Sequence, residues 1–197
     1  MPRIGDLAPD FEAETTKGTI RFSDYAKGRW VILFSHPSDF TPVCTSEMCG
    51  FATRKHEFDA LDTDLMGLSI DSIYSHLTWM NYVKQRTGVS LNFPIIADID
   101  MNVSGLYGMV QPNESEAGTV RAVFFIDPAK RIRMIMYYPL SVGRNMDEII
   151  RVLNALQSSD KHKGATPLDW RVGDEVLIHS SDDVDGMRSR LDDGGMQ

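Results

Sequence analysis

The chain has 197 residues, 42% of them hydrophobic, which suffices for one core of ordinary domain size with an appendage but not for a second full domain. Its 20 lysines and arginines against 28 aspartates and glutamates give a formal net charge of −8. Because no cluster of basic residues is interleaved with aromatic ones, nucleic acids and anionic membranes are not expected partners.

The N-terminal residues lack the apolar segment of a signal peptide, and no apolar run approaches the length of a membrane span. We therefore expect a cytoplasmic protein without membrane association. The chain has two cysteines, Cys44 and Cys49. In a reducing compartment such residues are more often reduced or catalytic than joined in a structural disulfide.

The N-terminal region is typical of short strands. Residues 10–15 alternate between apolar and polar side chains, Lys17-Gly18 is a turn signal, and residues 19–22 alternate again, which predicts an edge hairpin. A polar turn is expected over residues 23–28. The apolar run at residues 30–34 has the length and aliphatic content of a buried parallel strand.

A strand–helix–strand–helix pattern follows. A helix is expected over residues 44–61, then an apolar strand at residues 65–70. Asp71 and Ser72 are suitable cap residues for a second helix over residues 74–83. This alternation predicts parallel strands joined by right-handed crossovers.

The later elements complete an α/β domain. Gly108 can end a short helix, and an Asp127-Pro128 turn makes the last two strands a hairpin. The final helix carries apolar residues toward the core and charged residues outward. In order, we expect a strand at 93–98, a short helix to Tyr107, a polar loop at 110–118, strands at 120–126 and 132–138, and a helix at 146–156.

The C-terminal part differs in composition. From residue 157 the chain is rich in Ser, Lys, Asp and Gly, with thinly spread apolar residues. We therefore divide it into a main domain at residues 1–157 and an extension at residues 158–197. Because the extension cannot form a core alone, we expect it to pack on the main domain or on a second subunit up to about residue 179. An acidic tail then begins at about Ser180.

Cys44 is the first candidate for chemistry. Pro37 and Pro42 stop the preceding strand, and a helical pattern starts at the cysteine, which places Cys44 in the first turn of that helix. The unpaired N–H groups and the positive dipole end there favour an anion, so a thiol in this position loses its proton more readily than a free one. The thiolate is the reactive form.

The spacing Pro37-x-x-x-Thr41-x-x-Cys44 resembles the active-site motif of the peroxiredoxins, which are thiol peroxidases with a thioredoxin fold. The run from His36 to Thr45 is similar to the one-cysteine, peroxiredoxin six-like branch of the alkyl hydroperoxide reductase/thiol-specific antioxidant family. The resemblance extends from Gly5 to about Ile178, and it includes Gly5-Asp6-Leu7-Ala8-Pro9-Asp10-Phe11, Thr166-Pro167-Leu168-Asp169-Trp170 and Gly173-Asp174. It implies a thioredoxin-like α/β fold, with a central mixed sheet flanked by helices and a C-terminal extension.

Peroxide reduction needs a thiolate, donors for the developing alkoxide and a wall that limits water. Cys44 is the candidate nucleophile. Thr41, three residues earlier, can place its hydroxyl beside both the sulfur and the peroxide, and Pro37 can shield the pocket.

A permanent cation would favour the thiolate and stabilise the transition state. Arg121 is the candidate because it starts an apolar core strand, although alone it could equally form a surface salt bridge. In the family, an arginine in such a strand sits against the sulfur. The resemblance also implies that His36 hydrogen-bonds peroxide or tunes the cysteine, and that Glu47 and Arg144 hold the charges of the site in place.

Cys49 is not expected to resolve oxidised Cys44. On one helix, five residues correspond to about 7.5 Å of rise and about 140° of rotation. This exceeds the Cα separation of roughly 7 Å that a disulfide spans, so a bond requires the helix to unwind. The spacing is also not Cys-x-x-Cys, which counts against a dithiol oxidoreductase.

The expected activity is reduction of hydrogen peroxide and organic hydroperoxides through a Cys44 sulfenic acid, which an external thiol such as thioredoxin or glutathione reduces. No cofactor and no metal are expected. The resemblance implies a homodimer that can join into a decameric ring. Two alternatives remain open: a thioredoxin-fold redox sensor or holdase without efficient turnover, and a dithiol oxidoreductase with a Cys44–Cys49 bond.

Overall fold

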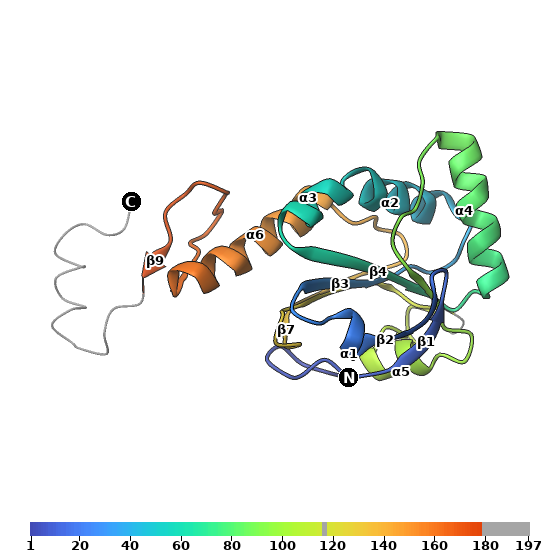
Figure 1. Ribbon diagram of the computed structural model, residues 1–197, viewed down its shortest axis with the longest axis horizontal. Helices are drawn as coiled ribbons and strands as arrows, with labels where there is room; N and C mark the ends of the chain where they lie inside the picture. Colours follow the sequence, from blue (N-terminus) through green and yellow to red (C-terminus); the bar gives the residue numbers. More distant parts are fainter. Residues whose placement is uncertain (116–117, 179–197) are drawn as a thin grey trace, which may run out of the picture. The chain divides into compact units, whose positions relative to one another are not determined.

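The computed structural model describes residues 1–115 and 118–178 (Figure 1). The chain divides into two compact units, and the second begins at Asp147. We describe each unit by itself. The boundary predicted between residues 157 and 158 stays a prediction.

The first unit contains a seven-stranded mixed sheet with the strand order β2-β1-β5-β4-β3-β6-β7. This arrangement confirms the predicted thioredoxin-like α/β fold with its edge hairpin at the N-terminus. The strands are β1 (Glu12–Thr15), β2 (Gly18–Arg21), β3 (Trp30–Ser35), β4 (Thr63–Ser69), β5 (Ile95–Ala97), β6 (Arg121–Ile126) and β7 (Ile132–Tyr138).

Strand β3 lies near the centre of the sheet, and all six of its residues are buried. It pairs in parallel with β4 and antiparallel with β6, while β4 pairs in parallel with β5. The antiparallel register, with Phe34 opposite Val123, places the carboxyl end of β3 beside the amino end of β6. Residues near positions 35 and 121 are therefore neighbours although more than 80 residues separate them.

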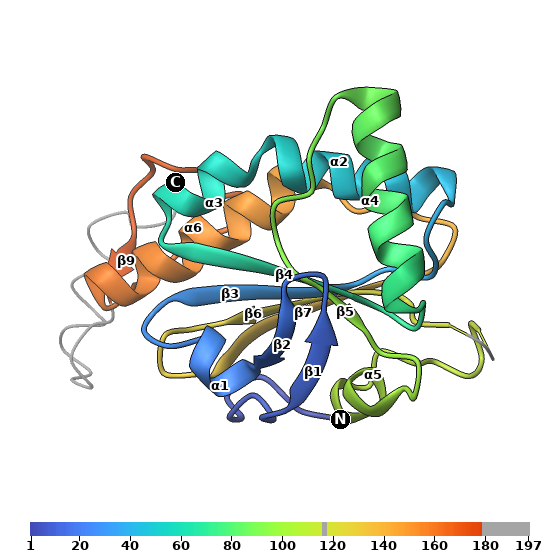
Figure 2. The ribbon, with the colours of Figure 1, turned by 45° about the vertical axis from the view of Figure 1, so that its right-hand side comes forward.

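Five helices belong to the first unit: α1 (Phe22–Tyr25), α2 (Pro42–Thr53), α3 (Lys55–Ala60), α4 (Ile73–Thr87) and α5 (Asn102–Tyr107). Helices α2, α3 and α4 lie on one side of the sheet, and α1 and α5 lie on the other (Figures 1 and 2). Ser72 caps α4 through a bond from the Ser75 N–H, as its sequence predicted. Gly108 follows α5 in the left-handed conformation, also as predicted.

Two local predictions were wrong. Residues 22–25 form the helix α1 where a polar turn was expected, with Phe22 buried beneath it. The helix expected over residues 44–61 is two helices, because the chain leaves helical geometry at Arg54. Buried aromatic residues still link the second part to the core, since the rings of Phe51 and Phe58 lie 6.1 Å apart.

The second unit contains most of α6 (Met146–His162) and a small antiparallel pair, β8 (Gly164–Ala165) with β9 (Leu177–Ile178). Helix α6 continues six residues beyond the predicted end at Leu156. Trp170 is buried, and its indole N–H donates to the carbonyl of Asp174 at 3.1 Å. The predicted acidic tail from Ser180 lies outside the described residues.

Among residues 1–115 and 118–178, no helix combines the length and the apolar content that crossing a bilayer requires.

Candidate active site

Cys44 lies in the first turn of α2, directly after the bend that follows β3, as predicted. Phe40 bends the chain with a positive φ of 59°, Thr41 is the N-cap residue, and Pro42 starts the helix. Proline is well suited to this position because the first helical N–H has no intrahelical partner. The Cys44 side chain is completely buried, so the sulfur faces protein groups rather than bulk water.

The guanidinium of Arg121, at the start of β6, lies against this sulfur. Its Nη1 donates to the Sγ of Cys44 at 3.4 Å. The same nitrogen donates to Oε2 of Glu47 at 2.8 Å. On the other side, Nε and Nη2 donate to the carbonyl of Leu140 at 3.2 and 3.0 Å. The sulfur of Cys44 therefore lies against a buried cation that is held on two sides.

A second guanidinium, that of Arg144, holds Glu47 in place. Its Nη2 and Nε donate to the two Glu47 oxygens at 2.7 and 3.1 Å, and its backbone N–H adds a bond of 2.8 Å. The remaining Nη1 donates to the carbonyls of Ser35 on β3 and Ala122 on β6. Arg144 therefore joins the carboxylate to the ends of both strands.

The charges of Arg121, Arg144 and Glu47 would be balanced by one further anion. Burial opposes ionisation of Glu47, but Arg144, and after it Arg121, hold the pKa of this carboxyl below its ordinary value. Two guanidiniums and one carboxylate sum to one positive charge in a site where water is excluded. A thiolate at Cys44 would neutralise the group.

Thr41 and Pro37 lie in the bend and are partly buried. The Thr41 hydroxyl donates to the carbonyl of Ser38 at 3.1 Å. A hydroxyl that donates in this way keeps its lone pairs for an incoming O–H group. The backbone carbonyl of Thr41 accepts from the N–H of Thr45 at 2.9 Å, which anchors the first turn of α2.

His36 follows β3 directly and is completely buried. Its Nε2 lies 2.9 Å from Oδ1 of Asp39, and its ring lies 5.2 Å from that of Trp79. The indole N–H of Trp79 donates to the hydroxyl of Thr45, the neighbour of Cys44. These contacts place His36 beside the first turn of α2.

The AhpC/TSA family model matches residues 4–135, and the model for the C-terminal domain of 1-Cys peroxiredoxin matches residues 155–194. The chain belongs to the AhpC/TSA family. This confirms the resemblance to one-cysteine peroxiredoxins, and it makes the protein an oxidoreductase of a thiol-dependent peroxidase family.

Curated peroxiredoxins are similar along almost the whole chain. A peroxiredoxin of Methanosarcina mazei is 48% identical over 97% of this chain and 90% of its own length. Peroxiredoxin 2 of Thermoplasma acidophilum is 46% identical over 98% and 96%, respectively.

Solved structures are similar in fold. A mutant of the peroxiredoxin 6 of Arenicola marina has a TM-score of 0.88 and 36% identity, covering 96% of this chain and 89% of that one. A yeast mitochondrial 1-Cys peroxiredoxin has a TM-score of 0.87 and 45% identity, covering 96% and 92%. The yeast structure is described as the basis of a thiol-resolving mechanism through the glutathione and thioredoxin systems.

The second cysteine of this peroxiredoxin has different surroundings. Cys49 is half-buried near the middle of α2, and its Sγ lies 4.0 Å from the hydroxyl of Thr87. Both cysteines are free thiols. They lie on one continuous helix, which is the arrangement expected to prevent a direct bond between them.

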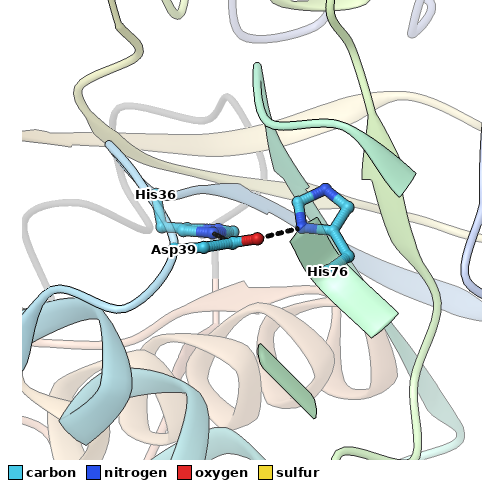
Figure 3. A group of neighbouring side chains, drawn as sticks. All are labelled: His36, Asp39 and His76. Carbon is cyan, nitrogen blue, oxygen red and sulfur yellow. Dashed lines mark hydrogen bonds and ion pairs between the residues drawn. The ribbon is translucent and has the colours of Figure 1, made fainter. Parts of the chain in front are cut away.

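The sequence interpretation did not single out Asp39, which contacts the candidate residue His36, or His76, which contacts Asp39. Asp39 lies in the bend three residues after His36, and His76 lies in the first turns of α4. Their side chains and that of His36 form a buried group (Figure 3). The spacing of His36 and Asp39 was a visible signal, but nothing local indicates that His76 joins them.

Proposed function

We propose that this peroxiredoxin reduces hydrogen peroxide and small organic hydroperoxides through a Cys44 sulfenic acid. The observation that carries the proposal is the Arg121 guanidinium, 3.4 Å from a sulfur that is completely buried. A fixed cation beside a dry thiol both favours the thiolate and stabilises negative charge that develops on oxygen.

The proposed reaction begins when the Cys44 thiolate attacks the nearer oxygen of HO–OR. The O–O bond breaks, the sulfur gains an OH group, and the leaving alkoxide takes a proton to give ROH. Arg121 stabilises the charge on the oxygens, the Thr41 hydroxyl orients the peroxide, and Pro37 limits water. Glu47 and Arg144 keep Arg121 in position through their mutual bonds.

His36 is proposed to accept a hydrogen bond from the bound peroxide. Its ring is buried beside the first turn of α2, and its Nδ1 has no hydrogen-bond partner among the described residues. A buried acceptor without a donor is costly, which a donor on the substrate would relieve.

Regeneration is proposed to use an external thiol. One thiol condenses with the sulfenic acid and releases water to form a mixed disulfide. A second thiol then releases Cys44 and leaves as a disulfide. Thioredoxin and glutathione are the proposed donors, since the similar yeast protein is described with both systems. Excess peroxide would convert the sulfenic acid to sulfinic acid because Cys49 does not compete for it.

The proposed setting is the cytoplasm, with a homodimer as the basic assembly and a decameric ring as a further one. The family resemblance supports the proposed assembly.

The test combines intact mass and turnover. One equivalent of hydrogen peroxide should add one oxygen to Cys44, trapped as an adduct by a sulfenic-acid reagent. Cys44→Ser should abolish peroxide consumption, while the matched variant Cys49→Ser should retain most of it. The reverse pattern would refute the assignment. A Cys44–Cys49 disulfide would indicate a dithiol oxidoreductase, and slow reaction with poor turnover on every donor would indicate a sensor.

A further inference from the structure

A second group of buried titratable side chains comes from the bend between β3 and α2 and from α4. It consists of His36, Asp39 and His76, whose side chains are at most 1% exposed. Nε2 of His36 lies 2.9 Å from Oδ1 of Asp39, and Nδ1 of His76 lies 2.8 Å from Oδ2. Figure 3 shows the carboxylate between the two rings.

The protons of His76 follow from its neighbours. Its Nε2 lies 3.1 Å from the carbonyl of Ile96, which can only accept, so this nitrogen carries a proton. Its Nδ1 faces the Asp39 carboxylate, which also accepts. Burial opposes ionisation of Asp39, but hydrogen bonds from His36 and His76 hold the pKa of this carboxyl well below its ordinary value. Both nitrogens of His76 therefore face acceptors, the arrangement that suits an imidazolium.

His36 has the opposite state. Its Nε2 donates to Asp39, while its Nδ1 is buried and has no partner in the described part of the chain. Burial, partly offset by Asp39, holds the pKa of His36 below its ordinary value. The ring is therefore neutral, with its proton on Nε2 and a lone pair on Nδ1.

The remaining contacts fix the carboxylate rather than change its charge. The Ser75 hydroxyl donates to Oδ2 of Asp39 at 2.8 Å. Asp71, the other nearby acid, accepts from the backbone N–H of Asp39 at 3.0 Å and from the Ser69 hydroxyl at 2.6 Å. One carboxylate and one imidazolium thus leave the three-residue group neutral overall.

These three residues also offer metal-ligand atoms, all within 4.8 Å of one another. The two imidazoles, however, meet different oxygens of the carboxylate at hydrogen-bond distance. This is a chain of donors and acceptors rather than a convergent set of ligands. A metal would have to replace the protons that the chain holds.

We propose that Asp39 and His76 are positioning residues: the His76 imidazolium keeps Asp39 ionised, and Asp39 fixes His36 as the neutral tautomer whose Nδ1 accepts from the peroxide. This inference rests on the proposed function, since it deepens the role of His36. It assigns to His76, which no sequence pattern singled out, control over the state of a group in the site.

The first experiment is nuclear magnetic resonance of the reduced full-length protein labelled with ¹⁵N-histidine, at neutral pH and without peroxide. The expected spectrum has His76 protonated on both nitrogens and His36 protonated on Nε2 alone. A singly protonated His76, a proton on His36 Nδ1, or stoichiometric zinc in the purified protein would overturn the proposal. This experiment uses only the wild-type protein, so its outcome does not depend on whether a variant folds.

The second experiment measures the rate constant for peroxide reduction in Asp39→Asn and His76→Gln. The rate constant of each variant should fall about tenfold, which is the loss expected for one well-placed hydrogen bond. In the spectrum of Asp39→Asn, the single tautomer of His36 should disappear. His56→Gln, which changes an exposed histidine on α3, is the matched control and should leave both readouts unchanged.

Alkylation of Cys44 by iodoacetamide separates this role from damage to the sulfur site, because Arg121 is intact in both variants and alkylation should be unchanged. Slower alkylation in step with the peroxide rate would overturn the positioning role. An Asp39→Asn variant that reduces peroxide as fast as an active wild type would also overturn the positioning role. The proposed function would then still stand. A wild type that consumes no peroxide would overturn the proposed function and this role together.

Discussion

The two cysteines of α2 have the same backbone conformation and very different neighbours. Cys44, in the first turn, is completely buried with a guanidinium nitrogen 3.4 Å from its sulfur. Cys49, five residues later, is half-buried, and its sulfur lies 4.0 Å from the Thr87 hydroxyl. Helix position contributes at the first turn, but the main difference is a charge delivered by another element, strand β6.

The comparison shows how the fold gives the two thiols different surroundings. Arg121 is held by Glu47 and by the carbonyl of Leu140, and Glu47 is held by Arg144. The surroundings of Cys44 therefore depend on three further buried side chains, those of Arg121, Glu47 and Arg144. The predictions below remove these supports in turn.

The largest effect is expected from Glu47→Gln, which leaves two buried guanidiniums without their shared carboxylate. Breaking a buried ion pair costs about 3–5 kcal/mol, and this should appear in the free energy of unfolding at neutral pH. Urea denaturation measures it. Glu57→Gln on α3, which breaks a surface pair with Arg54, is the control and should cost less than about 1 kcal/mol. Equal losses in both variants would contradict the buried network.

The lowered pKa of Glu47 also predicts how the free energy of unfolding depends on pH. Because the pKa of Glu47 is lowered in the folded state, the unfolded chain binds more protons once the pH falls below about 4.3, the ordinary glutamate value. The stabilisation is therefore complete above that pH and is lost as the pH falls further. Asp39 acts in the same direction. Denaturation curves between pH 7 and pH 3 should fall less steeply for Glu47→Gln than for the wild type, and parallel curves would refute this.

Arg121→Gln is expected to lower the peroxide rate constant by about 100- to 1,000-fold, or about 2.7–4 kcal/mol, the typical effect of removing one preorganised donor. Stopped-flow kinetics with hydrogen peroxide measures the loss. The comparison is sharpest if alkylation is followed at both thiols, because Cys44 should slow and Cys49 should not. Arg133→Gln on β7 is the control strand variant. If Cys44 is alkylated equally fast in Arg121→Gln and in the wild type, this guanidinium does not control the reactivity of the sulfur.

Thr41→Val should have a smaller effect, about tenfold in the peroxide rate constant, because it removes one hydrogen-bonding hydroxyl worth about 1–1.5 kcal/mol. The saturation behaviour with a bulky organic hydroperoxide should change as well. Thr53→Val, which removes a hydroxyl at the other end of α2, serves as the control. If both threonine variants match the wild type, Thr41 does not orient the substrate.

The smallest effect is expected from Cys49→Ser. The Cys49 sulfur has one weak contact and is only half-buried, so the free energy of unfolding should change by about 0.5 kcal/mol or less. A loss of several kcal/mol would mean that the second thiol is a core residue, and the contrast between the two cysteines would be wrong.

Some candidate residues of the sulfur site could be proposed from the sequence because their signals are local. Cys44 follows a strand and starts a helix, Glu47 lies one turn further on, and Arg121 places a charge at the start of an apolar strand. Strand pairing could be predicted for the same reason, since alternating strands and helices force parallel crossovers. The roles of Glu47 and Arg144 were expected only from the family resemblance.

The missed features depend on tertiary contacts. His76 meets Asp39 across 37 residues, and no local pattern encodes such a partner. The break at Arg54 interrupts a helical pattern that continues in the sequence. The last turns of α6, residues 157–162, are polar and lack the apolar periodicity by which a helix is recognised, so its end was placed too early.

The contact between Arg121 and Cys44 joins residues 77 positions apart in the chain. During synthesis, the cysteine is made long before the strand that carries its guanidinium. In a nascent or denatured chain the two thiols therefore lack this difference in surroundings, which arises only when β6 docks against β3. Under the proposed function, sensitivity to oxidant is in this way postponed until the polypeptide has folded.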